Sequence, residues 1–231
     1  MTISAFVLGV VGGRGGSGAS TLAAALAGQL ARRSATVLVD LDRGSGGIDV
    51  LLGLEGADGV RWPDLAGARG EVSGEDVLAM LPRWGSCAVL SADRSRPGAP
   101  EPAVVADVLH AVTSAAGAVV LDLDRGTVIA GESLAAACDA VLVVAPRDLR
   151  SIAGILALRP GLSGVPAWLV VRGPAPGGIG ATELSEAVGL PVLGSLRHDR
   201  RRAAALERGG PTGRGSLSRE AVRLVRALDP W

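Results

Sequence analysis

The chain has 231 residues, of which 48% are hydrophobic, and its 23 basic residues balance 23 acidic ones. This length suits one domain with a substantial core, which needs neither disulfides nor a structural metal. All 23 basic residues are arginine, and the sequence contains no lysine, no asparagine and no tyrosine. Schiff-base chemistry, a lysine general base and a lysine contact to phosphate are therefore excluded.

We expect neither a transmembrane helix nor a signal peptide. The longest apolar run is far shorter than the ~20 residues that cross a bilayer, and residues 5–11 run into glycines instead of a cleavage site. Cys87 and Cys138 lie in apolar surroundings without a CxxC motif or a nearby histidine. This pattern is typical of reduced core cysteines, and we expect a cytoplasmic protein.

Short β-branched runs alternate with longer stretches rich in alanine and leucine, as in βαβ units on a parallel sheet. The predicted strands are residues 6–11, 36–39, 88–90, 118–121, 140–144, 167–171 and 192–193. The predicted helices are residues 20–33, 104–115, 132–137, 151–158, 182–188 and 217–228. We predict one α/β domain over residues 1–231: a doubly wound, mostly parallel sheet with helices on both faces. Its ligand site should lie beyond the carboxyl ends of the strands.

Two predicted strands end in nearly the same sequence, VLVDLDRG and VVLDLDRG. Each places an Asp-x-Asp pair at the predicted ligand edge: Asp40 and Asp42 in the first, Asp122 and Asp124 in the second. Aspartate is also a common turn residue and helix N-cap after a strand, so a purely local role is the alternative for each.

A glycine-rich loop, GGRGGSGAST, follows the first predicted strand at residues 12–21 and leads into a helix-forming stretch. Its glycines let backbone N–H groups converge on an anion, and the helix start adds partial positive charge. We therefore predict a phosphate site at this loop. The loop fits two different motifs.

The first motif is the dinucleotide fingerprint GxGxxG, formed by Gly13, Gly15 and Gly18. In this frame Asp40 ends the second strand where an acid binds a ribose 2′-hydroxyl. An NAD-binding oxidoreductase is thus one alternative. Nothing downstream resembles a hydride-transfer site, since the chain has two histidines, no lysine or tyrosine, and no room for a substrate domain.

The second motif is the P-loop GxxxxGK[ST], which the loop fits from Gly13 onward at every position except the lysine, where Ala19 stands. In this frame Ser20 binds Mg²⁺ and Asp122 is the Walker B carboxylate. Asp40 and Asp42 face the γ-phosphate and the attacking water. This frame accounts for more residues than the dinucleotide frame does.

The sequence RGGSGAST resembles the deviant Walker A motif KGGxGK[ST] of the MinD/ParA ATPases. Arg14 stands at the family's signature lysine and Ala19 at its P-loop lysine. Residues 37–55 are similar to the switch I region of MinD. Residues 59–70 and 169–178 resemble actinobacterial CpaE-like (TadZ-like) proteins, which accompany Tad/Flp pilus and secretion ATPases. The resemblance covers nearly the whole chain.

The resemblance implies a cytoplasmic protein that binds ATP and Mg²⁺ and forms a face-to-face homodimer. It also implies recruitment of other machinery, such as a Tad or secretion-system ATPase, at a cell pole, a septum site or the membrane periphery. CpaE-like proteins usually carry a receiver-like domain ahead of the ATPase domain. We expect that domain to be absent here, because the first predicted strand begins within six residues of Met1. Asp-Leu-Asp also replaces the family's frequent Asp-x-Pro.

The resemblance transfers site roles residue by residue. Asp122 and Ser20 would organise Mg²⁺, and Asp42 with Asp40 would position water. The nucleotide-binding residues would be Gly13, Arg14, Gly15, Gly16, Ser17, Gly18, Ala19, Ser20 and Thr21, with Arg172 and Arg197 near the adenine.

Loss of the P-loop lysine should weaken nucleotide binding roughly 10- to 100-fold, because a charge-assisted hydrogen bond is worth about 1.5 to 3 kcal/mol. Hydrolysis should fall by about 10² to 10³, since the same cation stabilises the transition state. We predict that Arg14 compensates by reaching the partner's phosphates in a nucleotide-dependent dimer; the alternative is a solvated loop charge. The leading prediction is a nucleotide-dependent positioning or scaffold protein with weak or no hydrolysis. A competent ATPase of the same fold and a degenerate domain that binds nothing are the alternatives.

Charge is uneven along the chain: residues 197–231 hold nine arginines against four acids, a net of +5, and residues 1–196 carry −5. Residues 217–228 form an amphipathic pattern. Its apolar stripe comprises Leu217, Ala221, Leu224, Val225 and Leu228, and its basic face comprises Arg219, Arg223 and Arg226. Such a helix either docks on its own domain with a solvated basic face, or contacts membrane lipid, DNA or a partner.

Overall fold

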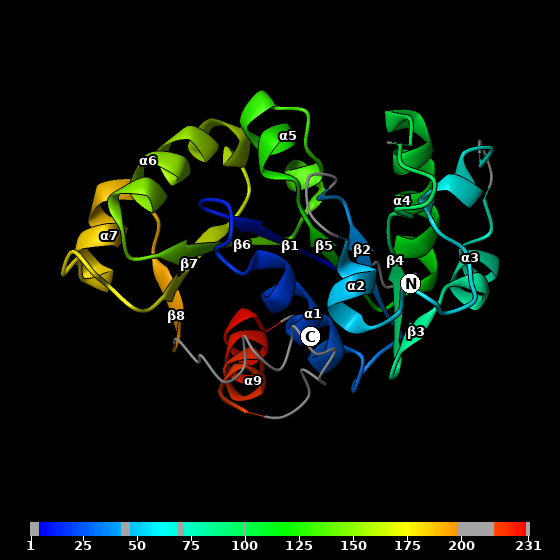
Figure 1. The fold of residues 1–231 in the computed structure, drawn as a ribbon, viewed down its shortest axis with the longest axis horizontal. Helices are drawn as coiled ribbons and strands as arrows, with labels where there is room; N and C mark the ends of the chain where they lie inside the picture. The colour runs from blue at the N-terminus through cyan, green and yellow to red at the C-terminus, as the bar shows by residue number, and fades with distance from the viewer. Residues whose placement is uncertain (1–4, 43–46, 69–71, 99, 198–214, 230–231) are drawn as a thin grey trace.

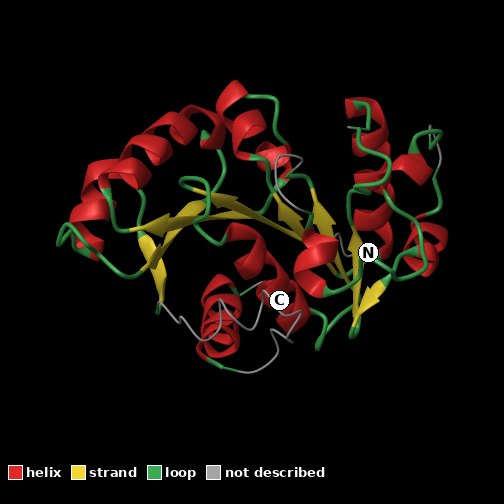
Figure 2. Cartoon of the chain, viewed as in Figure 1, coloured by secondary structure: helices red, strands yellow, loops and turns green. Residues whose placement is uncertain are grey.

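The computed structural model of the chain describes residues 5–42, 47–68, 72–98, 100–197 and 215–229. In these residues a central sheet carries helices on both faces (Figures 1 and 2). Parts of three segments discussed above, at residues 43–46, 69–71 and 198–214, lie outside the described residues.

The sheet has the strand order β3-β4-β2-β5-β1-β6-β7-β8, and all neighbouring strands are parallel except β3 and β4. The strands are β1 (Phe6–Gly12), β2 (Thr36–Asp40), β3 (Arg83–Trp84), β4 (Cys87–Leu90), β5 (Ala118–Asp122), β6 (Ala140–Pro146), β7 (Ala167–Arg172) and β8 (Val192–Leu196). The prediction of a mostly parallel α/β sheet is confirmed. Its central strands are rich in valine and fully buried, as expected where helices cover both faces.

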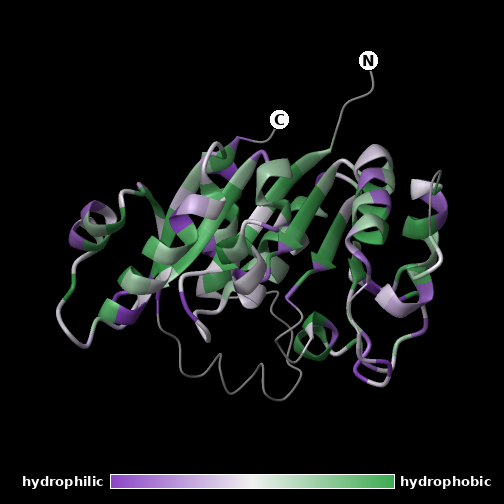
Figure 3. Cartoon of the chain, turned by 90° about the horizontal axis from the view of Figure 1, so that it is seen from above, coloured by the Kyte–Doolittle hydropathy of each residue, from purple (hydrophilic) through white to green (hydrophobic). Residues whose placement is uncertain are grey.

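The helices form a layer on each face of the sheet (Figure 1). They are α1 (Ala19–Leu30), α2 (Ile48–Leu52), α3 (Gly74–Met80), α4 (Pro102–Ala115), α5 (Arg125–Ala130), α6 (Leu149–Leu158), α7 (Ala181–Val188) and α9 (Ser216–Leu228), with 3₁₀ turns η1 (Trp62–Leu65), η2 (Leu134–Ala137) and η3 (Arg159–Leu162). One layer contains α1, α2 and α9, and the other contains α4, α6 and α7. In Figure 3 the strands are coloured as hydrophobic over most of their length, whereas the helices and loops carry both hydrophobic and hydrophilic residues. Each face of the sheet thus has its own hydrophobic core.

The predicted helix over residues 132–137 is wrong. The structure has α5 at Arg125–Ala130 instead, followed by the 3₁₀ turn η2. The Asp124 carboxylate accepts a hydrogen bond from the backbone N–H of Thr127 at 2.6 Å, which starts α5 directly after β5. Gly131, with φ of 75°, ends it. The short elements α3 and β3 are not among the predicted ones, because they are too short to show a helical or strand periodicity; helix α2 lies in the segment that resembles the switch I region of MinD.

Helix α9 docks on its own domain. Its residues Leu217, Ala221, Leu224 and Val225 are buried against α1 and β8, while its three arginines are exposed. The structure therefore shows the first of the two roles considered for this helix and leaves its basic face at the surface. No helix in the described part of the chain is long and apolar enough to cross a membrane. Both cysteines are free and buried, and burial raises the pKa of each thiol to about 12.

Candidate functional site

The glycine-rich loop joins β1 to α1 and lies at the carboxyl edge of the sheet. Gly16 and Gly18 have φ of 68° and 90°, a left-handed conformation that favours glycine. No side chain caps the start of α1. Its first backbone N–H groups are therefore free to bind an anion, as in other phosphate-binding helix starts.

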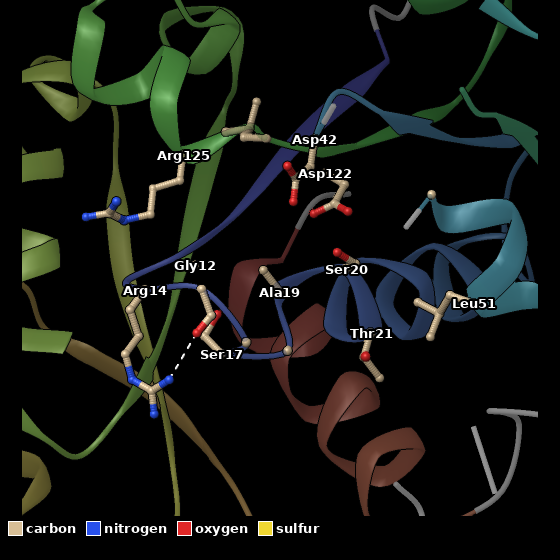
Figure 4. Close-up of a pocket in the computed structure, with 15 residues that line it drawn as sticks. Gly12, Arg14, Ser17, Ala19, Ser20, Thr21, Asp42, Leu51, Asp122 and Arg125 are labelled. Atoms are coloured by element: carbon tan, nitrogen blue, oxygen red, sulfur yellow. Dashed lines mark hydrogen bonds between the residues drawn. The ribbon is translucent and has the colours of Figure 1, made fainter. Parts of the chain in front are cut away.

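The loop forms one wall of a cleft of about 340 Å³ (Figure 4). The described residues that line the cleft are Gly12, Arg14, Gly15, Gly16, Ser17, Gly18, Ala19, Ser20, Thr21, Asp42, Gly47, Leu51, Asp122, Leu123 and Arg125. A Cβ added at Gly15 or Gly16 would meet no atom within 4 Å, so this part of the loop borders open space. The structure thus brings together nearly all of the predicted phosphate-binding residues with Asp42 and Asp122. Gly13 lies behind the cleft and turns the loop by donating its N–H to Val144 O at 2.9 Å.

Asp122 ends β5 and is 1% exposed. Burial raises its pKa to about 7; the Ser20 hydroxyl, which donates to it, works against this shift, and repulsion from Asp40 and Asp42 adds to it. Its Oδ2 atom is buried and has no hydrogen-bond partner among the residues that the structure describes. A buried carboxylate oxygen without a partner requires an explanation, and a cation held between Asp122 and Ser20 would satisfy it. The donor set therefore fits Mg²⁺.

Within the described residues, no three histidine, cysteine, aspartate or glutamate side chains gather into a group that could hold a metal ion. A Mg²⁺ site beside a nucleotide usually has only one or two protein oxygens, and phosphates and water complete it. The carboxylates of Asp42 and Asp122 point toward the Ser20 hydroxyl at the start of α1 (Figure 4).

Asp40 does not line the cleft. It is 3% exposed, and burial raises its pKa to about 6, although hydrogen bonds from backbone N–H groups lower it. Its carboxylate accepts the N–H of Asp42 at 3.1 Å and that of Ile48 at 2.9 Å, while Trp62 Nε1 donates to its carbonyl at 2.8 Å. The prediction placed Asp40 toward the phosphate, whereas the structure gives it the local task of holding Asp42 and the start of α2.

The two Asp-x-Asp pairs are not equivalent in space. Asp124 caps α5 and is absent from the cleft lining, so the local alternative is correct for this residue. In the first pair the second aspartate, Asp42, lines the cleft. In the second pair the first aspartate, Asp122, does so. The sequence repeat alone does not reveal this difference, because it depends on where each strand ends in the sheet.

Arg14 lines the cleft but is held by its own chain. Its Nε and Nη2 donate to Asp148 Oδ2 at 3.0 and 2.9 Å, and its Nη1 donates to the Gly15 carbonyl at 3.0 Å. Asp148 is the N-cap of α6. Desolvation raises the pKa of Asp148, but hydrogen bonds from Arg14 and Ser151 outweigh this and keep the pKa below its ordinary value. Arg14 is therefore held by Asp148 and by the loop, and is not simply a solvated loop charge.

Arg172 and Arg197 lie at the same edge of the sheet but outside the cleft lining. Arg172 Nη1 donates to the Ser17 carbonyl at 2.7 Å, which supports the loop from the side of β7. Arg197 is exposed just after β8. The structure thus gives Arg172 a contact with the loop, whereas Arg197 makes no hydrogen bond to the loop within the described ranges.

Arg125, which the sequence analysis did not single out, lines the cleft as the first residue of α5. Its Nε donates to the Gly13 carbonyl at 3.3 Å and its Nη2 to the Gly154 carbonyl at 3.4 Å. The signal that could have found it is the repeated DLDRG sequence, which puts an arginine directly after the second aspartate pair at the ligand edge.

The strand order bears on the choice between the two motifs. In the usual dinucleotide-binding sheet the first two strands are neighbours, and the acid at the end of the second strand meets the ribose. Here β5 lies between β1 and β2 and pairs with both. The residue that ends the strand beside β1 is therefore Asp122 and not Asp40. This topology favours the P-loop frame over the NAD-binding alternative.

The chain was compared with known protein families, with curated sequences and with solved structures. No model of a known protein family matches the chain. Uncharacterized proteins of Mycobacterium tuberculosis strains CDC 1551 and H37Rv are each 41% identical to it over 227 residues, which cover 97% of this chain and 64% of theirs. The chain therefore spans 64% of the length of these curated relatives.

Solved structures resemble the chain over nearly its whole length. A ParA family ATPase from Chlorobium tepidum has a TM-score of 0.78 at 18% identity, over 95% of this chain and 96% of that one. The septum site-determining protein MinD from Pyrococcus horikoshii, complexed with Mg-ADP, has a TM-score of 0.78 at 16% identity, over 97% and 96%. The chain thus has the fold of the MinD/ParA ATPases.

Proposed function

We propose that this chain binds ATP with Mg²⁺ in the cleft. Bound nucleotide then drives formation of a homodimer that positions or recruits other proteins, and turnover is slow or absent. The observation that carries the proposal is the cleft itself: an uncapped helix start and open glycines line it together with Asp122, whose buried Oδ2 has no hydrogen-bond partner among the described residues. An anion on the loop and a cation beside Asp122 would satisfy both.

The roles follow from the placement of each residue. The backbone N–H groups of residues 14–21 would bind the phosphates, and Ser20 with Asp122 would hold Mg²⁺. The metal, when bound, neutralises phosphate charge and orients the phosphates. Asp42 would position water, and Asp40 would hold Asp42 in place through the hydrogen bond to its N–H. Arg172 and Arg197 would lie on the adenine side of the loop.

Slow turnover follows from Ala19. A lysine here would place a cation against the phosphates from the first residue of α1, where the chain has only a methyl group. Binding can survive on backbone N–H groups and Mg²⁺, but a missing donor in the transition state costs about 10² to 10³ in rate. A nucleotide that is bound but not consumed acts as an assembly ligand.

The partner and position are inferred from the sequence resemblance. The segments at residues 59–70 and 169–178 support a Tad or secretion-system ATPase as the partner, with septum-site machinery as the other option. The exposed arginines of α9 would allow a weak contact with membrane lipid or DNA. We treat residues 1–231 as one cytoplasmic nucleotide-binding domain.

Titration of a fluorescent ATP analogue with and without Mg²⁺ tests the proposal, together with oligomer mass under the same conditions. We expect Mg²⁺-dependent binding, a mass shift from monomer to dimer, and little release of phosphate. NAD(H) in place of ATP is the matched ligand control. Absence of binding to any nucleotide would favour the degenerate domain.

A competent ATPase of the same fold is the second candidate, favoured by the presence of Asp42 in the cleft. Steady-state phosphate release separates it from the first, since only a competent ATPase should turn over without repair of the loop.

A further inference from the structure

Ala19 leaves the phosphate loop without its usual cation, and Arg125 is one of the arginines that line the same cleft. We propose that Arg125 binds the nucleotide phosphates in place of the missing loop lysine. The inference rests on the proposed function, because it assigns a role within the same nucleotide site. It identifies a cation of the same chain, so binding would not depend on a partner's Arg14.

Two arginines line the cleft, and only one of them has a carboxylate partner in the described part of the chain. Arg14 makes an ion pair with Asp148 at 2.9 Å. Arg125 makes no ion pair with any described residue. Its two hydrogen bonds, at 3.3 and 3.4 Å, are longer than the 2.7–3.2 Å range usual for N–H···O bonds. A guanidinium has five N–H donors, so Arg125 retains capacity for an anion.

The position of Arg125 is not explained by the stability of α5. A cation in the first turn of a helix opposes the helix dipole, which favours an acidic residue there. The side chain is half-buried, so part of its hydration is already lost. A bound phosphate would compensate both effects, and the neutral carbonyls of Gly13 and Gly154 do so only in part.

The chain brings this guanidinium close to the loop through two glycines. A Cβ on Gly154 of α6 would overlap the Gly13 carbonyl oxygen and come within 3.1 Å of Arg125 Nη2. Without side chains there, α6, the loop and Arg125 meet at one point. In Figure 4 the side chains of Arg14 and Arg125 extend on one side of the loop, opposite Asp42, Asp122 and Ser20. The lining of the cleft thus has two arginines on one side of the loop and two carboxylates with the Ser20 hydroxyl on the other.

The experiment separates charge from structural support. Arg125→Gln keeps hydrogen-bond donors but removes the charge, whereas Arg125→Lys keeps the charge with a different shape. We expect the dissociation constant for a fluorescent ATP analogue with Mg²⁺ to rise about 10- to 100-fold in Arg125→Gln. In Arg125→Lys it should stay within about threefold of wild type. Tripolyphosphate as a competitor should lose affinity in Arg125→Gln to the same extent, because the contact is to phosphate.

The matched control is Arg159→Gln, since Arg159 also donates to a carbonyl, that of Gly189 at 3.0 Å, but is absent from the cleft lining. It should bind nucleotide as wild type does. Melting temperatures of all three variants without nucleotide report on structural damage. Equal loss of binding in Arg125→Gln and Arg125→Lys, with a lowered melting temperature, would overturn the proposal in favour of structural support.

A relocated charge gives a second test. Ala19→Lys should restore binding in the Arg125→Gln background, and Ala19→Gln should not. A wild type that binds neither ATP nor tripolyphosphate overturns the proposed function together with this inference. A wild type that binds both, beside an Arg125→Gln variant with the same affinity, overturns only the role of Arg125.

Discussion

The Arg14 guanidinium donates two hydrogen bonds to one carboxylate oxygen of Asp148, at 3.0 and 2.9 Å. The other oxygen of Asp148 accepts the N–H of Ser151 at 2.8 Å and so caps α6. In the proposed nucleotide-dependent dimer Arg14 would contact the phosphates of a second protomer, and its ion pair with Asp148 would compete with that contact.

Asp148→Asn should increase the dimer fraction in Mg²⁺-ATP. Asparagine keeps the cap on α6 but removes the charge that holds Arg14, so less free energy is needed to release the arginine. Sedimentation velocity over a range of protein concentrations measures the shift. Arg14→Ala, which removes the bridging cation itself, should remain monomeric. Identical dimer fractions in wild type and both variants would contradict a role for Arg14 in assembly.

The Arg14–Asp148 pair should contribute little to stability, because both side chains are partly exposed, at 34% and 23%. The pKa of Asp148 is lowered in the folded state. The contribution of ionised Asp148 to the free energy of unfolding is thus present above the ordinary aspartate pKa, and it is lost as pH falls through the lowered value. We expect Arg14→Ala to change the free energy of unfolding at pH 7 by less than about 1 kcal/mol, as measured by urea denaturation.

Ala19→Lys should raise phosphate release by about 10² to 10³ if Asp42, Asp122 and Ser20 are otherwise competent. The new cation would sit at the start of α1 against the phosphates. Ala19→Gln, similar in length but neutral, is the control for added bulk. Steady-state phosphate release at saturating ATP measures the effect. An unchanged rate, with ATP still bound, would show that hydrolysis is limited by something other than the missing lysine.

Asp122→Asn should stabilise the nucleotide-free protein at pH 7.5. Burial raises the pKa of Asp122 to about 7 and that of Asp40 to about 6, so the folded state binds these protons more tightly than the unfolded chain. The contribution of the two protonated aspartates to the free energy of unfolding is complete below about pH 4, and it is lost as pH rises toward 7. Removing one charge should raise the melting temperature by about 2 to 4 °C for each kcal/mol added to the free energy of unfolding.

Melting curves between pH 4.5 and 8 measure this effect, and Asp58→Asn, at an exposed aspartate, is the control. The melting temperature of Asp122→Asn should depend less on pH than that of wild type. It should also gain less from Mg²⁺-ATP, because the metal loses a ligand. A lower melting temperature at pH 7.5 would contradict the argument from burial.

Gly154→Ala should destabilise the protein by about 1 to 3 kcal/mol, the usual cost of overpacking. An added Cβ would overlap the Gly13 carbonyl oxygen and press on Arg125. Gly67→Ala is the matched control, because a Cβ there meets no atom within 4 Å. Urea denaturation measures the difference. If both variants were equally stable, the contact between α6 and the loop would be looser than the structure shows.

The parallel sheet and the phosphate loop could be predicted from local patterns. Fully apolar strands such as residues 118–121 require cover on both faces, and the loop glycines at residues 12–18 serve a turn that favours few other residues. The predicted strands at residues 36–39 and 140–144 lie within β2 and β6 for the same reason. These features depend on short-range sterics and on hydrophobic periodicity, which the sequence carries directly.

The tertiary structure determines which role each charged residue has. Asp40 and Asp42 are two residues apart, yet one is buried among backbone N–H groups and the other lines the cleft. Arg14 is held by a carboxylate 134 residues away in the sequence. Such pairings depend on strand order and on the packing of α6 against the loop, and no local pattern encodes them. The absence of lysine among the 23 basic residues is visible in the sequence, whereas only the tertiary structure places Arg125 in the lining of the cleft.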